Sequence, residues 1–312
     1  MDPLADVVSL LRPQTLLWKY IEASGRWALS FSDRREPHFG LVVAGGCWLR
    51  MRGDAATLLR EGDYLLLPSS RSYSFYSDPE VSAVLSDDAF QNADEGRVRL
   101  GDRTGDVACR LVGGQFNFAP TNSGLLLRFL PDLVHIRSSE VGAEQIRAIM
   151  GLIGQEAALM RPGRELVLSR LVEIMLVEAL RSANATPDAR PRGMLGGLAD
   201  PPIARALHQI HADVQRAWSV AELASNVGLS RSVFSRRFGE AVGTAPIDYL
   251  LNWRMALAKD RLIGGEQSIA GIAASIGYQS ASAFSTAFSR IVGCPPARFA
   301  AEARTSARVP AR

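Results

Sequence analysis

The sequence of 312 residues contains few cysteines and histidines, three and four respectively. Its cysteines, Cys47, Cys109 and Cys294, lie far apart and form no Cys-x-x-Cys pair. Such spacing argues against a disulfide framework or a cysteine-rich zinc site and is typical of a reducing compartment. No Ser-His-Asp set, phosphate-binding loop or carboxylate pair stands out either. The sequence therefore offers no obvious catalytic motif.

Long hydrophobic runs are also missing, because no stretch approaches the roughly 18 apolar residues that a membrane-spanning helix needs. The start, MDPLADVVSLLRPQ, has no basic region followed by an apolar stretch, so we expect no signal peptide. The hydrophobic share of 47% and the charged share of 21% are those of a soluble globular protein. We therefore expect a cytoplasmic protein of about two domains with no membrane partner.

Charge is unevenly distributed along the chain. Residues 200–312 hold 13 basic and 8 acidic residues, a net charge of +5. Residues 1–199 hold 22 basic and 24 acidic residues, a net charge of −2. Positive charge concentrated in one segment suits a polyanion-binding domain, although this excess alone favours nucleic acid only weakly.

The stretch ANATPDARPRGMLGG, which begins at residue 183, has Gly, Pro and short polar residues and no helical or strand period. Such composition is typical of a linker, which we place at residues 184–199. It separates an N-terminal domain of residues 1–183 from a C-terminal domain of residues 200–304. We expect residues 305–312 to form a disordered tail.

The N-terminal half reads as short strands separated by Gly, Pro, Asp and Ser. The strand candidates are WALSF (27–31), FGLVVAG (39–45), CWLRM (47–51), DYLLLP (63–68), YSFYS (73–77) and LLLRFL (125–130). Several short strands with turn signals predict a sandwich or a small barrel. Its aromatic residues either line a ligand cavity or, as we favour, fill the core. These residues are Trp27, Trp48, Tyr64, Tyr73, Phe75 and Tyr76.

Two helices are predicted at residues 141–160 and 164–183. In the second, Leu168, Leu171, Val172, Met175 and Leu180 fall near helical spacing. This apolar pair either packs on its own domain or forms the interface of a homodimer. We expect a homodimer.

Residues 220–246 and 270–296 carry the same pattern twice. At an offset of 49, Ala221, Leu223, Ala224, Val227 and Gly228 match Ala270, Ile272, Ala273, Ile276 and Gly277. At an offset of 50, Ser230, Ser232, Phe234, Ser235, Phe238, Gly243 and Pro246 match Ser280, Ser282, Phe284, Ser285, Phe288, Gly293 and Pro296. So many matches indicate one supersecondary unit present in two copies.

Each copy reads as a short helix that ends at Gly, a tight turn, and a second helix that follows a Ser. Ser219 and Glu222 match the S-x-x-E capping box, and Ser230 and Ser280 suit the N-cap of the second helices. A helix, a tight turn with Gly and a second helix form the helix-turn-helix unit. The sequence therefore predicts two helix-turn-helix units.

The second helix of each copy has an apolar stripe, formed around Phe234 and Phe238 or around Phe284 and Phe288. Its other face carries short hydroxyls or Arg, namely Ser232, Ser235 and Arg236 in the first copy and Ser282, Ser285, Thr286 and Ser289 in the second. A solvated face normally carries Lys and Glu, which form helices better than Ser. We therefore favour a surface that docks into a major groove, where Ser, Thr and Arg reach bases and phosphates.

Between the two copies, residues 246–263 predict one long helix that starts at Pro246 and ends before Gly264 and Gly265. Eighteen residues span about 27 Å. This length is close to the ~34 Å that separates successive major-groove faces on one side of DNA. The helix is either a rigid spacer that sets this distance, as we favour, or a scaffold of no special length.

Residues 200–300, with GLSRSVFSRRF, WRMALAKDRL and IGYQSASAFSTAFSRIVGCPPARF, resemble the AraC/XylS-type transcription regulators. The resemblance implies a seven-helix domain that binds double-stranded DNA through two helix-turn-helix units. By this likeness, base-reading positions are Ser232, Ser235 and Arg236 in the first unit and Ser282, Ser285 and Thr286 in the second. The full set of expected DNA-binding residues is Arg231, Ser232, Ser235, Arg236, Arg237, Ser280, Ser282, Ser285, Thr286 and Arg290. The second set has no long basic or amide side chain, so it chiefly positions the protein on the DNA backbone.

The N-terminal pieces GCWLRM, LREGDYLLLPSSRSYSF and LVGGQFNF resemble the cupin-type sensor domain found in some members of this family. This implies a small antiparallel β-barrel followed by helices, and so an α+β protein overall. Where metal-binding cupins commonly have a His, this chain has Tyr73, and His38 and His135 lie far apart in sequence. We therefore expect no metal and no cofactor.

Taken together, the residues predict a sequence-specific DNA-binding transcription regulator that is not an enzyme. A small molecule or a redox signal at the N-terminal domain is an open possibility for its control. Cys47 and Cys109 read as buried inert thiols, with redox sensing as the alternative. The competing functions are a cupin-type metalloenzyme with an appended DNA-binding module and an architectural protein that binds DNA without base preference.

Overall fold

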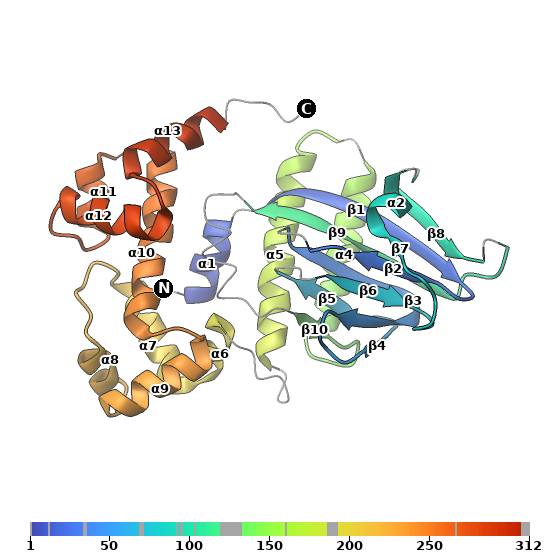
Figure 1. The fold of residues 1–312 in the computed structure, drawn as a ribbon, viewed down its shortest axis with the longest axis horizontal. Helices are drawn as coiled ribbons and strands as arrows, with labels where there is room; N and C mark the ends of the chain where they lie inside the picture. Colours follow the sequence, from blue (N-terminus) through green and yellow to red (C-terminus); the bar gives the residue numbers. More distant parts are fainter. Residues whose placement is uncertain are drawn as a thin grey trace. The chain divides into compact units, whose positions relative to one another are not determined.

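The computed structural model describes residues 2–11, 13–33, 36–68, 72–91, 93, 96–102, 104–118, 133–159, 161–185, 193–265 and 267–306. The chain divides into two compact units (Figure 1). A strand-rich unit is built from residues 12–118 and 131–189, and a helical unit includes residues 1–11 and 190–312. Each unit is described by itself below.

In the described residues, the strands of the first unit form one ten-stranded sheet. The strands are β1 (Pro13–Ser24), β2 (Ala28–Phe31), β3 (His38–Met51), β4 (Thr57–Arg60), β5 (Tyr64–Leu67), β6 (Tyr73–Tyr76), β7 (Val84–Leu85), β8 (Arg97–Gly101), β9 (Cys109–Phe118) and β10 (Val134–Ile136). Their main order is β7-β2-β6-β3-β9-β1-β8, with β4 and β5 paired to β3 and β10 paired to β5. The pairs β1–β8 and β2–β7 are parallel, and the other pairs are antiparallel.

The long strand β3 makes the sheet curl, because its two halves pair with different strands. Residues 38–45 pair with β5 and β9, and residues 46–51 pair with β4 and β6. At the change of partners, Gly45 has a φ of 71°, and a Cβ there would lie 1.9 Å from the Ala108 carbonyl oxygen. Only glycine fits such a backbone. The curled sheet confirms the expected cupin-like N-terminal fold and the α+β class.

Apolar side chains from most of these strands meet inside the curl. The buried core includes Ile21, Ala23, Trp27, Leu29, Val42, Leu49, Leu59, Leu65, Leu67, Tyr73, Phe75, Leu100 and Leu111. Of the other aromatic residues considered above, Tyr64 and Tyr76 are buried, whereas Trp48 is exposed. The predicted strand LLLRFL lies outside the described residues.

In its described residues, the strand-rich unit also has the helices α2 (Ser86–Gln91), α4 (Ala143–Ala158) and α5 (Arg164–Ala185). Helix α2 contacts β2, β7 and β8, so it lies at the opening between the two edges of the sheet. Helices α4 and α5 pair with each other, and α5 contacts β1 and β10. The two helices predicted at residues 141–160 and 164–183 are thus present within a few residues of the expected ends.

The helical unit is built around one long helix, α10 (Figure 1). Its described helices are α1 (Pro3–Leu11), α6 (Met194–Ala199), α7 (Pro201–Ala212), α8 (Val220–Asn226), α9 (Arg231–Val242), α10 (Pro246–Gly264), α11 (Ile269–Ser275), α12 (Ala281–Val292) and α13 (Pro296–Ser306). Among the described residues, no helix is both long enough and apolar enough to span a bilayer.

Helix α6 forms where the sequence indicated the end of the linker. Met194 and Leu195 are almost fully buried, and α6 contacts α7 and α9. Gly193 supplies the turn before it, with a φ of 86°. The glycines of MLGG suggested a flexible stretch, but Gly197 is itself buried against the side chains of Leu207 and Val242. Residues 194–199, which the sequence placed at the end of the linker, are therefore packed within the helical unit.

The N-terminal helix α1 packs against α7 and α10 in the helical unit. Asp6 Oδ2 lies 3.0 Å from His211 Nδ1, and His211 Nε2 lies 2.9 Å from the Tyr249 hydroxyl. The His211 ring also stacks on Trp253 at 4.3 Å between centroids. Because both ring nitrogens are engaged in a buried site, His211 ties three helices together.

This site predicts a dependence of stability on pH. Burial lowers the pKa of His211, against the opposing effect of Asp6 and with a smaller contribution from His208. As the pH falls below about 6.5, the unfolded chain binds a proton that the folded state resists, so stability present at neutral pH is lost. We expect the protection factors for hydrogen exchange in α7 and α10 of the full chain, which are corrected for the intrinsic exchange rate at each pH, to fall as the pH is lowered from about 7.5 to 5.5.

The replacement His211→Asn should flatten this pH dependence. His208→Asn, one turn earlier on the exposed face of α7, is the control and should keep most of the pH dependence, because His208 contributes less than burial to the pKa of His211. An equal pH dependence in the two variants would remove His211 as its source.

Candidate functional site

The two helix-turn-helix copies have the same dimensions. Helices α8 and α11 contain 7 residues each, and α9 and α12 contain 12 residues each. Ser219 and Ser268 cap the first helices, and Ser230 and Ser280 cap the second helices through their hydroxyls. Gly243 and Gly293 end α9 and α12 in the left-handed conformation. The duplication and the caps at Ser219, Ser230 and Ser280 are therefore confirmed, and Ser268 adds a cap that the sequence reasoning missed.

The turn between the helices is built alike in both copies. Gly228 and Gly277 have φ values of 77° and 85°, and each follows the last turn of its helix. The next amide, at Leu229 or Tyr278, donates to the carbonyl of Ala224 or Ala273 at 3.0 and 2.9 Å. The second turn is one residue longer, which explains the change of offset from 49 to 50.

Helices α9 and α12 bury the same positions. Phe234 and Phe238 on α9, and Phe284 and Phe288 on α12, are fully buried. The residues around these phenylalanines, 235–241 on α9 and 285–291 on α12, have the same order of exposed, half-buried and buried positions. The apolar stripes expected from the sequence thus face the core and leave the opposite side of each helix at the surface.

On α9, Arg231, Ser232 and Arg236 are exposed, and Ser235 is half-buried. The Arg236 side chain is 71% exposed, with Glu240 3.9 Å away along the helix. Arg237 differs in that its guanidinium forms an ion pair outside α9, with Asp200, the N-cap residue of α7. Of the expected contact residues on α9, Arg237 therefore has a structural partner within the unit.

On α12, Ser280, Ser282, Thr286 and Arg290 are exposed, and Ser285 is half-buried. The Thr286 hydroxyl donates to the Ser282 carbonyl at 3.1 Å. This bond to the preceding turn holds the hydroxyl oxygen close to the helix surface. Helix α12 consequently presents a smooth surface of short polar groups with Arg290 near its end.

Helix α10 joins the two copies. It is 19 residues long, which corresponds to about 28 Å. Figure 1 shows α8 and α9 at one end of α10, and α11 and α12 at the other. Tyr249 contacts Phe238 of α9, while Met255, Ala258 and Leu262 share a core with Phe284 and Phe288 of α12.

Arg254 of α10 fixes the loop that connects α7 to α8, a role that the sequence did not indicate. Its guanidinium donates to the carbonyls of Val214 and Arg216, at 3.0 and 2.9 Å. The same loop touches Gly277, the turn residue of the second copy. One arginine thereby connects both copies to the central helix.

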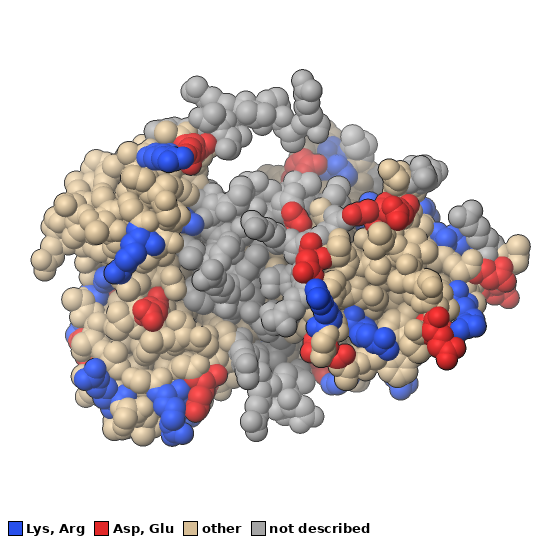
Figure 2. Space-filling model, in the orientation of Figure 1, with Lys and Arg blue, Asp and Glu red and all other residues tan. Residues whose placement is uncertain are grey.

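The charge on the surface differs between the two copies. Figure 2 shows basic side chains around the end of the helical unit that holds α8 and α9. The surface over α11 and α12 is largely uncharged in the same view. The first copy thus offers more attraction for a polyanion than the second.

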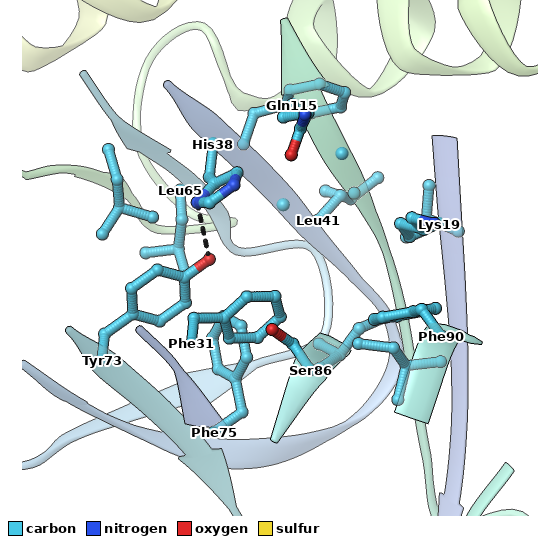
Figure 3. Close-up of a pocket in the computed structure, with 18 of the residues that line it drawn as sticks. Lys19, Phe31, His38, Leu41, Leu65, Tyr73, Phe75, Ser86, Phe90 and Gln115 are labelled. Carbon is cyan, nitrogen blue, oxygen red and sulfur yellow. Dashed lines mark hydrogen bonds between the residues drawn. The ribbon is translucent and has the colours of Figure 1, made fainter. Parts of the chain in front are cut away.

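The strand-rich unit contains a cavity of about 440 Å³. It is lined from β1, β2, β3, β5, β6, β9 and α2 (Figure 3). Tyr73 and Phe75 line it, whereas Trp27, Trp48, Tyr64 and Tyr76 do not. The expectation that the aromatic residues fill the core therefore holds for all of the set except Trp48, and Tyr73 and Phe75 line the cavity as well as belonging to the core.

His38 and His135 have separate partners. His38 Nδ1 lies 3.1 Å from the Tyr73 hydroxyl, and His135 Nε2 lies 3.1 Å from Asp63 Oδ2. Among the described residues, no group of three or more His, Cys, Asp and Glu side chains has metal-binding geometry. Tyr73, which stands where metal-binding cupins commonly have a histidine, thus forms a hydrogen bond with His38 of β3.

Cys47 and Cys109 are both buried on neighbouring strands. The hydrogen bond between them and burial raise the pKa of the Cys47 thiol. A buried protonated thiol is a poor nucleophile. The same hydrogen bond lowers the pKa of the Cys109 thiol, against the effect of its burial. Both residues pack in the core cluster, as expected, and the inert state is supported for Cys47 only.

Comparison with known proteins shows two family matches. A family model described as "Cupin" matches residues 2–185, and one described as "Helix-turn-helix domain" matches residues 223–302. The chain is 40% identical over 297 residues to an "AraC-like transcription regulator" of Streptomyces lividans, covering 95% of this chain and 97% of the relative. It is 39% identical over 298 residues to a protein of the same description from Streptomyces antibioticus, with the same coverage.

Among solved structures, the chain is similar to the DNA-binding domain of AdpA, a global transcriptional factor, in complex with a target DNA. The identity is 28% and the TM-score is 0.32, with 34% of this chain and 95% of that chain covered.

The two turn glycines allow a matched test of the helix-turn-helix geometry. A Cβ at Gly228 would meet nothing within 4 Å, whereas one at Gly277 would lie 2.2 Å from the Gln215 carbonyl oxygen. Gly228→Ala should cost about 1–2 kcal/mol of stability through the left-handed backbone alone. Gly277→Ala should cost clearly more, as read from urea unfolding of the full chain. Equal losses would show that the loop at Gln215 is not packed on the second turn.

Proposed function

Because this chain belongs to the AraC-like transcription regulators, we propose that its two recognition helices read consecutive major-groove turns of one DNA site. The chain is a DNA-binding transcription regulator with a cupin-type N-terminal domain and a helix-turn-helix domain. The observation that carries the proposal is the duplicated unit. Two helices of equal length, each with the same two phenylalanine positions buried, lie at opposite ends of one buried helix.

The spacing supports two contacts on the same side of the duplex. Helix α10 spans about 28 Å, and α9 and α12 pack beside its two ends. Successive major-groove faces lie about 34 Å apart. Because α10 is buried along its length, the distance between the recognition helices is set by packing rather than by a linker.

In this proposal, α9 supplies the base contacts. Arg236 is a long exposed donor in the middle of the helix, and Arg can bond guanine through O6 and N7. Ser232 and Ser235 beside it are short enough to let the helix lie deep in the groove. Arg231, at the first helical position, is placed for a phosphate. Arg237 acts indirectly, by holding α9 to Asp200 of α7.

Helix α12 takes a different part in the proposal. Ser280, Ser282, Ser285 and Thr286 lack the reach of Arg, so they contact backbone phosphates or the nearest base edges. Arg290, near the end of the helix, adds one positive charge. The second copy therefore contributes position and affinity more than base choice.

The N-terminal unit serves as a sensor in the proposal, since a cavity of about 440 Å³ is of the size that binds small molecules. We place its action in the cytoplasm, where the DNA is. A regulator is preferred to an enzyme because the chain's relatives are transcription regulators and because His38 and His135 have separate partners. A preference of the protein for particular bases would distinguish a regulator from an architectural protein, which binds DNA without base preference.

A second copy of the chain is proposed to cover the exposed apolar side chains of α4 and α5. Leu166, Val167 and Ile174 are exposed and lie within about 100° of one another around α5. Leu152 on α4 is also exposed. A group of large exposed apolar residues on one face is typical of a protein interface. Met175, considered from the sequence as an interface residue, is fully buried within the unit, so a charge there would disturb the fold first.

The base-reading role of Arg236 predicts a loss of specificity. Arg236→Ala should weaken binding to a selected duplex by roughly 1–3 kcal/mol and relax the preference at one base position. Arg298→Ala is the matched control, since Arg298 is also 71% exposed and also pairs with a Glu four residues on. Titration of selected and randomised duplexes measures both effects. An unchanged base preference in Arg236→Ala would remove this assignment.

The dimer proposal predicts that a charge on α5 separates the subunits. Ile174, 54% exposed, should give monomers when changed to Glu, because a carboxylate cannot be buried unpaired in an apolar interface. Leu85→Glu on β7, at a residue 53% exposed, is the control and should keep the parent's mass in light scattering. A dimer that survives Ile174→Glu would place the interface elsewhere.

A further inference from the structure

The cavity of the strand-rich unit has a polar group on each of two opposite sides. Figure 3 shows Lys19 and Phe90 on one side, with His38 and Tyr73 on the other. Lys19 comes from β1 and His38 from β3, with β9 between them. Two strand spacings of about 4.8 Å separate β1 from β3 by about 10 Å.

The strand register places these polar groups on the same face of the sheet. Lys19 pairs with Gly113 of β9, and His38 pairs with Gln115. Residues 113 and 115 point to one face, because side chains alternate along a strand. Gly113 also pairs with Gly40 of β3. Between the two polar ends, the cavity lining therefore includes Gly40 and Gly113, which have no side chain to fill the space.

The walls are aromatic and are arranged to hold a flat ring. Phe31 and Tyr73 are stacked at 4.6 Å with an interplanar angle of 10°. Phe75 meets both of them edge-on, at 6.0 and 5.5 Å. Aromatic rings attract a further ring in offset-stacked or edge-to-face positions. The site thus suits a planar aromatic molecule.

Lys19 indicates the charge of this molecule. Its ammonium lies 4.6 Å from the centre of the Phe90 ring, and no carboxylate of the described residues forms an ion pair with it. Asp87 and Asp88 also line the cavity, but they are exposed in the first turn of α2. A half-buried ammonium is stabilised most by a carboxylate. It also repels a cationic ligand that could otherwise bind against the aromatic rings.

We propose that this cavity binds an aromatic carboxylate, with its acid group on Lys19 and a polar substituent at its far end on His38 and Tyr73. The hydrogen-bonded pair of His38 and Tyr73, both buried, offers donor and acceptor groups for a hydroxyl. One part of this inference rests on the proposed function, namely that the bound acid is the signal to which the regulator responds. Binding itself does not involve DNA.

The test uses three naphthalene probes with the full-length protein, followed by calorimetry. The first is a hydroxynaphthoate with its hydroxyl on the ring opposite the carboxylate. The second is naphthoate, which lacks the hydroxyl, and the third is naphthol, which lacks the carboxylate. We expect saturable binding of one hydroxynaphthoate per chain, with naphthoate weaker and naphthol weakest.

Three variants separate the parts of the site. Lys19→Gln should weaken both acids by roughly tenfold or more and leave naphthol unchanged. Tyr73→Phe should weaken the hydroxynaphthoate several-fold and leave naphthoate unchanged. Gly40→Val should block all three probes by filling the cavity. A Cβ at Gly40 would have its nearest neighbour at 3.9 Å, and Val suits a strand, so this variant should fold.

DNA binding by the parent, Lys19→Gln and Gly40→Val is measured without any acid. Loss of DNA binding in the parent would contradict the proposed function and leave the cavity result standing. The inference is overturned by absence of saturable acid binding, or by acid binding that Lys19→Gln or Gly40→Val leaves intact. Tighter binding of naphthol than of either acid overturns it as well.

Discussion

The burial of α10 on almost every side is the constraint on which the helical unit depends. Tyr249, Leu250 and Trp253 are buried at one end, and Met255, Ala258 and Leu262 are buried toward the other. Burying one large apolar side chain contributes about 1.5–3 kcal/mol, so several of them hold both copies firmly. A helix buried in this way cannot bend or slide without opening two cores. The separation of α9 and α12 is therefore a property of packing.

The remaining features of the helical unit serve this arrangement. Arg254 joins α10 to the loop before α8, and that loop rests on the turn at Gly277. Asp6 brings the N-terminal helix to His211, which also holds Tyr249 of α10. These polar groups are satisfied by one another away from water, which favours one unique arrangement over many similar ones. The exposed faces of α9 and α12 are thus left to the polar residues that do not pack.

Much of the helical unit could be predicted from the sequence because the helix-turn-helix pattern occurs in it twice. Matching pairs such as Phe234 with Phe284, and Gly228 with Gly277, gave the helices, the turns and the buried faces. Residues with long-range partners could not be assigned in this way. Arg237 resembled its neighbour Arg236, and only the fold brings Asp200 within reach of it. Likewise, the glycines near Met194 suggested a linker, although Gly197 is required because it packs closely against Leu207.

In the strand-rich unit, Lys19, Phe31 and Phe90 lie far apart in sequence, and the curl of the sheet brings them to one cavity.

The central claim is that one subunit contacts two successive major grooves on the same face of DNA. Methylation protection of guanine N7, with the full-length protein on a selected duplex, measures this directly. The account predicts two protected segments per bound subunit, centred about 10–10.5 base pairs apart, with the segment under α9 the more strongly sequence-dependent. A single protected segment, or two segments on opposite faces of the duplex, would contradict it.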